Sequence, residues 1–454
     1  MNYNHIIASQ RAFFDTNATK DHRFRKIQLK KLRSLLVANE RRLYDAIYAD
    51  FKKSEFETAA TELLLIYHEI DLALENMESW SRQKGVPTNL VNFPSRSYII
   101  PEPLGVTLVI GAWNYPFQLS LAPAVAALAA GNTVVLKPSE IPANTAAVMT
   151  SIINENFPAG YFHVVEGGVE TSTALLECKF DKIFFTGSTA VGKIVYEAAA
   201  KHLTPVTLEL GGKSPAIVMA DCNMEVTVKR LAWAKFLNAG QTCIAPDYVL
   251  VEASAEKKFM DALRKYIEQN YTAGATENYV QIINDKNLER LLKLLDPSKI
   301  VIGGNYSRES RYLAPTVMQQ VSFSDPVMQE EIFGPILPVI AFTDLNEAIQ
   351  KVKGLPKPLS CFVFSTSGKK IKQVLAELSF GGGAVNDAVM HISNSALPFG
   401  GVGNSGMGNY HGEAGFRSFS HYKSILHKSS WLETNIKYPP YAGWKQRLIR
   451  WMMK

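Results

Sequence analysis

The fold of this chain depends on a stretch from residue 103 to residue 136, which reads PLGVTLVIGAWNYPFQLSLAPAVAALAAGNTVVL and contains no charged side chain. A transmembrane helix needs about 20 consecutive apolar residues, but proline, glycine, asparagine and glutamine interrupt this run. Residues 106–110 are rich in β-branched side chains, residues 119–130 in alanine, and residues 133–136 resemble another strand. We therefore predict strand, loop, buried helix and strand, which is a βαβ unit with a buried parallel sheet.

The alternation of strands and helices continues beyond this unit. The predicted strands are 106–110, 133–136, 162–165 and 182–186, with helices between them and a further helix at 190–201. A second series has strands at 206–209, 216–218, 247–252 and 360–364, and helices at 224–237, 255–269 and 369–378. Strands that alternate with helices indicate a doubly wound α/β architecture. From residue 381 onward the chain is rich in glycine.

The first 80 residues have the periodicity of helices. Apolar side chains recur three and four positions apart in 26–36, 40–51 and 62–80, which predicts amphipathic helices. Glycine and proline interrupt this pattern after residue 84, and residues 96–100 are predicted to form a strand, in a hairpin or at the edge of a sheet.

The composition is that of a globular protein. The chain has 454 residues, 47% of them hydrophobic and 20% charged, which predicts about two to four domains and excludes wholesale disorder. Its four cysteines are too few and too scattered for a disulfide framework or a cysteine-rich metal site. No export signal is visible at the N-terminus, so a reducing cytoplasm is expected.

The net charge of +6 is concentrated at the C-terminus. Residues 434–454 contain five basic residues and no acidic one. The rest of the chain is nearly neutral, which argues against binding to nucleic acid.

Two polar segments follow predicted strands. The segment KIFFTGSTAVG, 182–192, is a strand, a glycine turn and a helix start, an arrangement that points backbone N–H groups at an anion. It lacks GxGxxG, and Ile194 stands where a P-loop needs serine or threonine, so an NTPase is disfavoured. Lys137 and Glu140 follow another strand, at the edge where such sheets bind ligands. The plain alternatives are a strand-to-helix turn and a solvated charge pair.

Three further residues are candidates for chemistry. Cys243 lies in a polar loop, NAGQTCI, although lone cysteines are usually buried apolar groups. Glu209 lies between apolar strand residues before two glycines; burial would suit it to act as a general base, and the alternative is a side chain that faces water. Asn114 lies in the segment WNYPF that follows the first strand of the βαβ unit, where its amide suits an oxyanion or a helix N-cap.

Together these segments resemble the NAD(P)-dependent aldehyde dehydrogenase superfamily. Seven motifs occur in family order over nearly the whole chain: WNYPF (113–117), KPSE (137–140), FTGS (185–188), LELGGKSP (208–215), GQTC (240–243), EEIFGP (330–335) and LPFGG (397–401). The run 397–421 and the later Tyr438-Pro439-Pro440 resemble the class 3 branch, the fatty and aromatic aldehyde dehydrogenases.

The resemblance implies a mechanism with three catalytic residues and no metal. Cys243 is the expected nucleophile, which forms a thiohemiacetal with the aldehyde and then a thioester. Asn114 and the Cys243 backbone N–H are expected to hold the oxyanion. Glu209 is expected to activate the water that hydrolyses the thioester to a carboxylic acid. Tyr115 is expected to line an apolar pocket for fatty or aromatic aldehydes.

The resemblance also implies the cofactor contacts. Lys137 and Glu140 are expected at the adenosine ribose, Gly187 and Ser188 at the pyrophosphate, and Glu331 and Phe333 at the nicotinamide side. Glu140 disfavours a 2′-phosphate by like charge, whereas Lys137 favours one. We therefore expect NAD to be the cofactor, with NADP also accepted.

The family fold implies three domains and a C-terminal tail. The NAD(P)-binding domain is expected at 1–82 and 105–208, and the catalytic domain at 209–385. A bridging element, 83–104 and 386–432, is expected to extend a sheet in the partner subunit of a homodimer. Residues 433–454 form the basic tail.

The tail has two interpretations. A helix over 444–454 places Trp444, Leu448, Trp451 and Met452 on one face and basic residues on another, although Lys445 interrupts the apolar face. This pattern suits peripheral contact of residues 441–454 with an anionic membrane surface, in line with the C-terminal membrane extensions of fatty-aldehyde members. The alternative is a tail docked on its own or the partner subunit.

Three alternative functions remain. An acylating enzyme would pass the thioester to coenzyme A, although Glu209 argues against it. A non-catalytic family member would be a structural or membrane-surface protein, and a cysteine esterase would use the same thiol without cofactor. The sequence leaves the physiological aldehyde and its pathway open.

Overall fold

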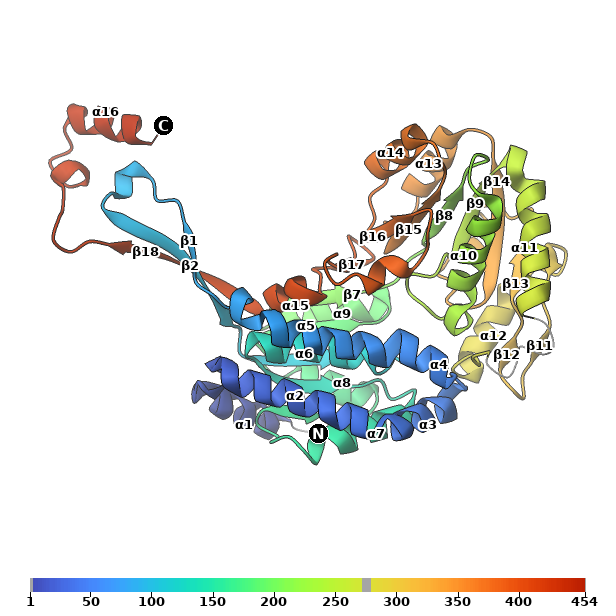
Figure 1. The fold of residues 1–454 in the computed structure, drawn as a ribbon, viewed down its shortest axis with the longest axis horizontal. Helices are drawn as coiled ribbons and strands as arrows, with labels where there is room; N and C mark the ends of the chain where they lie inside the picture. Colours follow the sequence, from blue (N-terminus) through green and yellow to red (C-terminus); the bar gives the residue numbers. More distant parts are fainter. Residues whose placement is uncertain (1–2, 272–278, 454) are drawn as a thin grey trace.

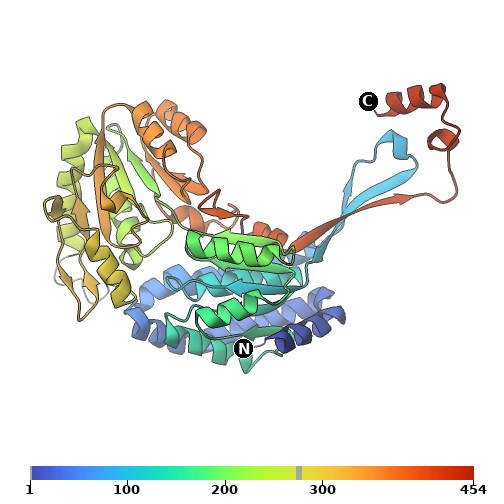
Figure 2. The ribbon, with the colours of Figure 1, turned by 180° about the vertical axis from the view of Figure 1, so that it is seen from behind.

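A computed structural model describes residues 3–271 and 279–453 of the chain. Two bodies of helices and sheet lie beside each other, and a long arm of strands projects from one end of the first body (Figure 1; Figure 2 shows the opposite side). The sheets of the two bodies are mainly parallel, which confirms the predicted α/β class.

The first body is built on a six-stranded sheet with the order β17-β7-β6-β3-β4-β5. The strands are β3 (Val106–Ile110), β4 (Thr133–Lys137), β5 (Phe162–Val164), β6 (Lys182–Thr186), β7 (Val206–Glu209) and β17 (Gly406–Met407). All but β17 are parallel. Every residue of β3, β4 and β6 is buried, because helices cover both faces of the sheet.

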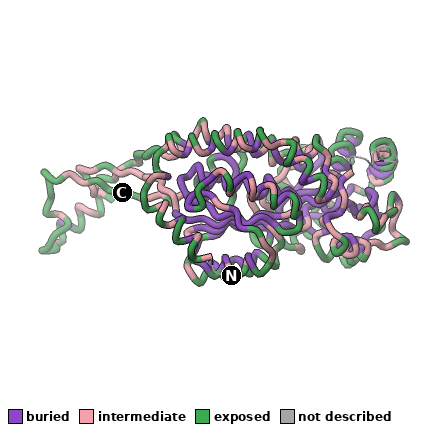
Figure 3. The backbone as a smooth tube through the Cα atoms, turned by 90° about the horizontal axis from the view of Figure 1, so that it is seen from below, coloured by how far each residue is buried: buried purple, intermediate pink, exposed green. Residues whose placement is uncertain are grey.

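The uncharged segment forms the centre of this body, as predicted. Helix α6 (Gln118–Ala130) connects β3 to β4, and all of its residues are buried. It packs against α5 (Leu64–Trp80) and α2 (His22–Ala38). Because α6 has no face to water, charged side chains are excluded from it, and Figure 3 shows the buried residues gathered along this core.

The remaining helices cover the two sheets. Around the first sheet they are α1 (Asn4–Asp15), α3 (Glu40–Phe51), α4 (Glu55–Thr58), α7 (Ala143–Asn154), α8 (Val169–Leu176), α9 (Thr189–Ala200) and α15 (Gly412–Ser418). In the second body they are α10 (Met224–Phe236), α11 (Glu256–Asn270), α12 (Asp285–Lys293), α13 (Leu345–Lys353) and α14 (Gly368–Glu377).

The second body contains a seven-stranded sheet with the order β10-β13-β14-β9-β8-β15-β16. The strands are β8 (Pro215–Val218), β9 (Tyr248–Glu252), β10 (Ile300–Ile302), β13 (Thr316–Met318), β14 (Ile336–Phe342), β15 (Ser360–Phe364) and β16 (Gly382–Val385), and a separate ribbon pairs β11 (Tyr306–Ser307) with β12 (Tyr312–Leu313). Strands β10, β13, β14 and β16 were not predicted from the sequence. A proline such as Pro338 is unusual in a central strand like β14, because it has no N–H to donate. Pro338 lies opposite a residue of β13, and the pairing of β14 with β9 begins only at Val339.

The arm joins segments far apart in sequence. Strand β2 (Ser95–Pro103) lies between β1 (Lys84–Val86) and β18 (Ser420–Lys428), and β2 and β18 pair over nine positions. No residue of β2 or β18 is buried. Helix α16 (Gly443–Met452) packs near the 3₁₀ turn Leu90–Asn92 at the tip of the arm.

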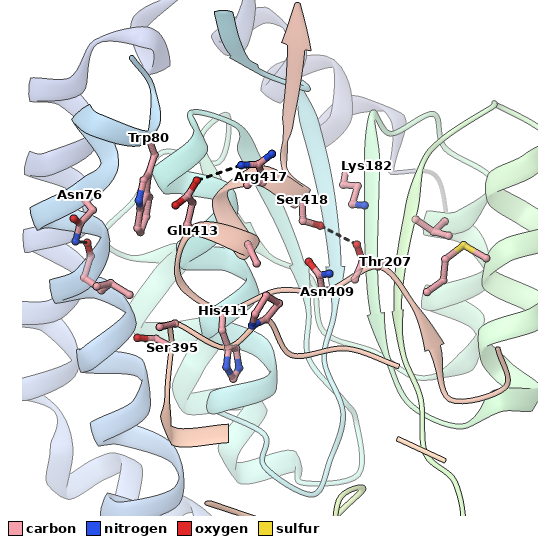
Figure 4. Close-up of a pocket in the computed structure, with 17 residues that line it drawn as sticks. Asn76, Trp80, Lys182, Thr207, Ser395, Asn409, His411, Glu413, Arg417 and Ser418 are labelled. Atoms are coloured by element: carbon pink, nitrogen blue, oxygen red, sulfur yellow. Dashed lines mark hydrogen bonds and ion pairs between the residues drawn. The ribbon is translucent and has the colours of Figure 1, made fainter. Parts of the chain in front are cut away.

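The chain that leads into the arm is anchored by a buried histidine. The His411 ring stacks on Phe399, with centroids 5.3 Å apart, and meets the Tyr410 ring edge to face. It lies beside a cavity at the root of the arm (Figure 4). Burial lowers the pKa of His411 to about 4, so the ring is neutral in the folded protein at neutral pH.

We expect His411 to make the fold sensitive to mild acid. Between pH 6.5 and pH 4 the unfolded chain protonates this histidine and the folded chain does not, so stability falls as pH falls. At about 1.4 kcal/mol per pKa unit, His411 accounts for a loss of about 2 kcal/mol between pH 7 and pH 5. Urea unfolding of His411→Asn at the two pH values should show a loss smaller by this amount. The exposed His421 offers the control His421→Asn, and an unchanged loss in His411→Asn would contradict the expectation.

Candidate active site

A cleft of about 650 Å³ opens at the carboxyl ends of the first sheet and reaches across to the second body. Nine of the ten predicted site residues line it, and they are Asn114, Lys137, Glu140, Gly187, Ser188, Glu209, Cys243, Glu331 and Phe333. They come from the carboxyl ends of β4 and β7, from the loops that follow β3, β4 and β6, and from two loops of the second body. Parallel strands thus collect these polar groups at one edge, as expected for an open α/β sheet.

A second cavity, of about 900 Å³, lies at the root of the arm and holds none of the predicted site residues. Figure 4 shows that Trp80 of α5, Lys182 at the start of β6 and Arg417 of α15 border it. Because it lies at the amino end of β6, it is away from the edge at which the candidate chemistry gathers.

Cys243 is half-buried beside two carboxyl groups. Burial raises the pKa of its thiol, and the nearby Glu331 and Glu209 raise it further. The loop before it contains two consecutive residues in the left-handed region, Asn238 and Ala239. Such strained backbone conformations occur at functional sites when the surroundings enforce them.

Asn114 is held by both its side chain and its backbone. Its Nδ2 donates to the carbonyl oxygen of Gln241 at 3.0 Å, and its second amide hydrogen has no partner among the described residues. Its carbonyl oxygen accepts from Asn238 Nδ2 at 2.9 Å and from Lys53 Nζ at 3.2 Å. These bonds join the loop after β3 to the loop that contains Cys243.

Glu209 ends β7 and is 3% exposed. Neither carboxylate oxygen has a hydrogen-bond partner among the described residues. Burial raises the pKa of Glu209 well above its ordinary value. The water-facing alternative is thereby excluded, and a buried carboxyl group without partners is rare unless it has a function.

Tyr115 does not line the cleft. Its ring is buried, and its hydroxyl lies 2.5 Å from Thr242 Oγ1. The Lys53 ammonium lies 4.2 Å from the ring centroid. Tyr115 therefore packs behind the Cys243 loop, and its place in an aldehyde pocket stays a prediction.

Lys137 and Glu140 form an ion pair at the mouth of the cleft, with 2.8 Å between Lys137 Nζ and Glu140 Oε2. Burial works to raise the pKa of Glu140, but the bond from Lys137 holds it below its ordinary value. The Glu140 side chain is 41% exposed, so its carboxylate is accessible to a ligand.

The glycine turn after β6 permits close approach of a ligand to the backbone. A Cβ on Gly187 would lie 2.5 Å from the Phe185 ring, so larger side chains are excluded. Ser188 caps α9 by accepting from the Val191 N–H. The exposed Val169 and Ile194, on α8 and α9, add apolar surface to this part of the cleft, which suits a flat aromatic ring.

The Glu331–Phe333 loop belongs to the second body, and hydrogen bonds to its backbone hold it in place. Arg290 Nη2 donates to the Ile332 carbonyl at 2.6 Å, and Asp247 Oδ1 accepts from the Ile332 N–H at 2.8 Å. Burial raises the pKa of Glu331 to about 8, and Asp247 contributes. The Phe333 ring meets the Trp113 ring at a centroid distance of 5.2 Å, so the two loops touch across the cleft.

Sequence reasoning missed the residues that hold these loops, among them Lys53, Glu62, Asn238 and Arg290. Lys53 and Glu62 are fully buried and paired, but they lie in a segment whose polar residues look like a solvated helix face. The one local signal was a KSEFE run, which places a lysine beside acidic residues. No group of three or more His, Cys, Asp or Glu residues suited to a metal ion occurs within 3–271 and 279–453.

Residues 1–425 match the aldehyde dehydrogenase family. The chain belongs to this family. Relatives named as family 3 members are 44–45% identical, which confirms the likeness to the class 3 branch. This aldehyde dehydrogenase is an NAD(P)-dependent enzyme.

Two curated relatives and one solved structure are especially similar to it. The 4,4'-diaponeurosporen-aldehyde dehydrogenase of Staphylococcus aureus is 46% identical, over 95% of both chains. The mouse enzyme named aldehyde dehydrogenase, dimeric NADP-preferring, is 44% identical, over 97% of this chain and 98% of its own. The substrate-bound structure of Staphylococcus aureus AldH is 45% identical and covers 100% of both chains with a TM-score of 0.98.

Proposed function

We propose that this enzyme oxidises medium- or long-chain aliphatic or aromatic aldehydes to carboxylic acids through a thioester on Cys243. The observation that carries the proposal is one cleft in which a thiol, a free amide hydrogen and an unpartnered buried carboxyl group meet. A nucleophile, an oxyanion donor and a base are the parts that acyl chemistry requires.

In the first half of the reaction, the Cys243 thiol releases its proton to solvent, its sulfur adds to the aldehyde carbon, and the carbonyl π electrons move to oxygen. The free hydrogen on Asn114 Nδ2 and the Cys243 N–H hold the resulting oxyanion. Bound NAD(P)⁺ supplies the acceptor for the hydride that leaves this carbon. The oxyanion then re-forms a carbonyl, and Cys243 carries a thioester.

In the second half, Glu209 removes a proton from water as the water oxygen attacks the thioester. The C–S bond breaks, the carboxylic acid leaves, and the proton held by Glu209 passes to the departing sulfur, which restores the thiol and the carboxylate. Burial raises the pKa of Glu209, which makes its carboxylate a stronger base than an exposed one. The whole reaction consumes one aldehyde, one water and one oxidised cofactor.

We propose that the nicotinamide cofactor binds along this cleft. Lys137 and Glu140 present donors and acceptors to ribose hydroxyls, and the turn at Gly187 and Ser188 borders the pyrophosphate. Glu331 and Phe333 lie at the nicotinamide side. The charge of Glu140 favours NAD, and Lys137 supports acceptance of NADP as well.

The acyl acceptor is water rather than coenzyme A. Transfer of the acyl group to a thiol needs no buried base beside the thioester. Glu209 nevertheless lies in the cleft with Cys243, although burial of its carboxylate costs free energy of desolvation. A non-catalytic role is disfavoured for the same reason, because an unpartnered buried carboxyl group has no structural use.

We also propose a homodimer assembled through the arms. Strands β18 and β16 are outer strands of their sheets, and open edges of this kind are normally covered. Pairing of β18 with β16 of a second copy covers both. The second copy would also cover the cavity at the root of the arm, which Lys182 borders. Lys182 is buried without a partner within the described chain, and burial lowers its pKa to about 8.

The tail is proposed to contact a membrane surface from the cytoplasmic side. The structure corrects the predicted apolar face: Leu448, Ile449 and Met452 turn inward, whereas Trp444 and Trp451 are 54% and 67% exposed. Lys445 also packs inward, and its Nζ donates to the Tyr438 carbonyl at 2.9 Å. Residue 454 lies outside the described residues.

Two exposed tryptophans beside Arg447 and Arg450 suit an anionic interface. Within the described chain, no helix is long and apolar enough to cross a membrane. The four cysteines are unpaired, which supports a reducing compartment.

The reaction class is tested by following reduced cofactor, with NAD⁺ and NADP⁺, against straight-chain aldehydes of increasing length and benzaldehyde. We expect kcat/KM to rise with chain length and to be higher with NAD⁺. In Cys243→Ala, kcat/KM should fall by about a thousandfold or more. Cys222→Ala should keep the native kcat/KM, since Cys222 lies outside the cleft. Ester cleavage without reduction of cofactor would favour the esterase, and no reaction at all would favour a non-catalytic member.

Glu209→Gln separates the two halves of the reaction. We expect one rapid turnover of reduced cofactor followed by slow release, with an acyl adduct on Cys243 visible by mass spectrometry. In the native enzyme, kcat should fall as pH falls through a pKa above the ordinary glutamate value, because only the carboxylate accepts the proton. Fast release of acyl-coenzyme A by Glu209→Gln would instead identify an acylating enzyme.

The membrane proposal is tested by sedimentation with vesicles that contain about 30% phosphatidylglycerol, which gives them the negative surface potential of a charged leaflet. Trp444→Ser/Trp451→Ser should weaken binding by about tenfold or more, while Tyr306→Ser, an exposed aromatic far from the arm, should bind like the native enzyme. Native-like binding by the double variant overturns the proposal. Dissociation of its dimer would show that the tryptophans cover the partner subunit.

A further inference from the structure

Lys53 and Glu62 form an ion pair behind the cleft, and both side chains are 0% exposed. Lys53 Nζ lies 2.8 Å from Glu62 Oε1. Buried ion pairs contribute little net stability, because desolvation offsets the attraction between the charges. The pair therefore calls for an explanation other than stability.

The remaining hydrogen bonds of the pair go to one short stretch of chain. Lys53 Nζ donates to the Asn114 carbonyl at 3.2 Å. Glu62 Oε2 accepts from the Phe117 N–H at 2.8 Å and from the Gln118 N–H at 3.3 Å. The Phe117 and Gln118 N–H groups lie at the start of α6. A carboxylate at this end of a helix accepts hydrogen bonds from N–H groups that have no partner within the helix, and it complements the helix dipole.

The backbone around Glu62 is specialised. Residues Ala59–Leu63 form a π-helical turn between α4 and α5. Such turns are rare and occur mostly at functional sites, because the extra residue changes the direction of a side chain. Here the turn contains Glu62, whose carboxylate reaches the loop after β3.

The same segment also contacts the Cys243 loop. Glu57 Oε1 accepts from the Asn238 N–H at 2.8 Å, and Asn238 in turn donates to the carbonyls of Asn114 and Gln241. Residues 53–62 thus bridge the two loops that carry the proposed nucleophile and oxyanion donor.

We propose that Lys53 and Glu62 are positioning residues for the reaction, and that their ion pair holds the Asn114 amide at the place where the aldehyde oxygen develops its charge. Lys53 fixes the Asn114 carbonyl, and Glu62 fixes the start of α6 three residues later. This inference rests on the proposed oxyanion role of Asn114.

The test removes both charges together, so that no unpaired charge remains buried. Lys53→Met/Glu62→Leu is measured in single turnovers, with enzyme in excess over aldehyde and saturating NAD⁺. We expect the rate of cofactor reduction to fall about 10- to 100-fold, since misplacement by about 1 Å has effects of this size. The dissociation constant for NAD⁺ should stay near the native value, which a general loss of structure would not allow.

Where this variant fails to fold, Lys53→Met/Glu62→Gln keeps an oxygen for the α6 N–H groups and still removes both charges. The matched control is Lys299→Met/Asp325→Leu, which removes an ion pair of the second body that lies outside the cleft. The control should reduce cofactor at the native rate.

A double-mutant cycle with Asn114→Ala identifies the residue through which the pair acts. If the pair acts through Asn114, removing the pair from Asn114→Ala should slow cofactor reduction by less than about twofold. An equal loss in both backgrounds overturns the inference, as does a native rate in Lys53→Met/Glu62→Leu. If Asn114→Ala alone reduces cofactor at the native rate, the oxyanion role fails, and the inference fails with it.

Discussion

The site depends on hydrogen bonds between loops that belong to different sheets. Asn114 follows a strand of the first sheet, whereas Asn238 and Gln241 belong to the second body. The side-chain amides of Asn114 and Asn238 both donate to the Gln241 carbonyl, and the Asn238 amide also donates to the Asn114 carbonyl. Gln241 also bonds the backbone of Gln281 and Ile283. Because these groups are buried, water does not compete for them, and the bonds connect the two separate sheets that build the cleft.

The sequence was sufficient to predict the strands that build the cleft. Strands such as β3 and β6 are buried on both faces and read as continuous apolar runs, which is the strongest strand signal. β14 was missed because Pro338 argues against a central strand, and only the offset pairing of its two neighbours removes the conflict. The periodicity of the tail predicted a helix but not its inward face, since the 3₁₀ turn Leu90–Asn92 that it packs against lies over 350 residues earlier.

Some residues of the candidate site could likewise be predicted from the sequence, and others could not. Cys243, Glu209 and Asn114 follow predicted strands or lie in short motifs, so a single sequence pointed to them. Lys53 and Glu62 gave no such signal, because their contacts to residues 114–118 span more than 50 positions. A charged residue in an amphipathic segment is usually solvated, and a run such as KSEFE (53–57) does not by itself distinguish a lysine that tertiary packing has buried.

Burial has opposite consequences for the groups that hold the cleft and for the groups that line it. Lys53 and Glu62 are buried with their charges paired and hydrogen-bonded, so they are fixed and leave no reactive group. Glu209 is buried with both oxygens unpartnered, and desolvation raises its pKa and that of the Cys243 thiol. A buried side chain without hydrogen-bond partners is stabilised most by a ligand that supplies a proton or a hydrogen bond. The unsatisfied side chains therefore mark where water and aldehyde react, and the satisfied ones set the distances at which they do so.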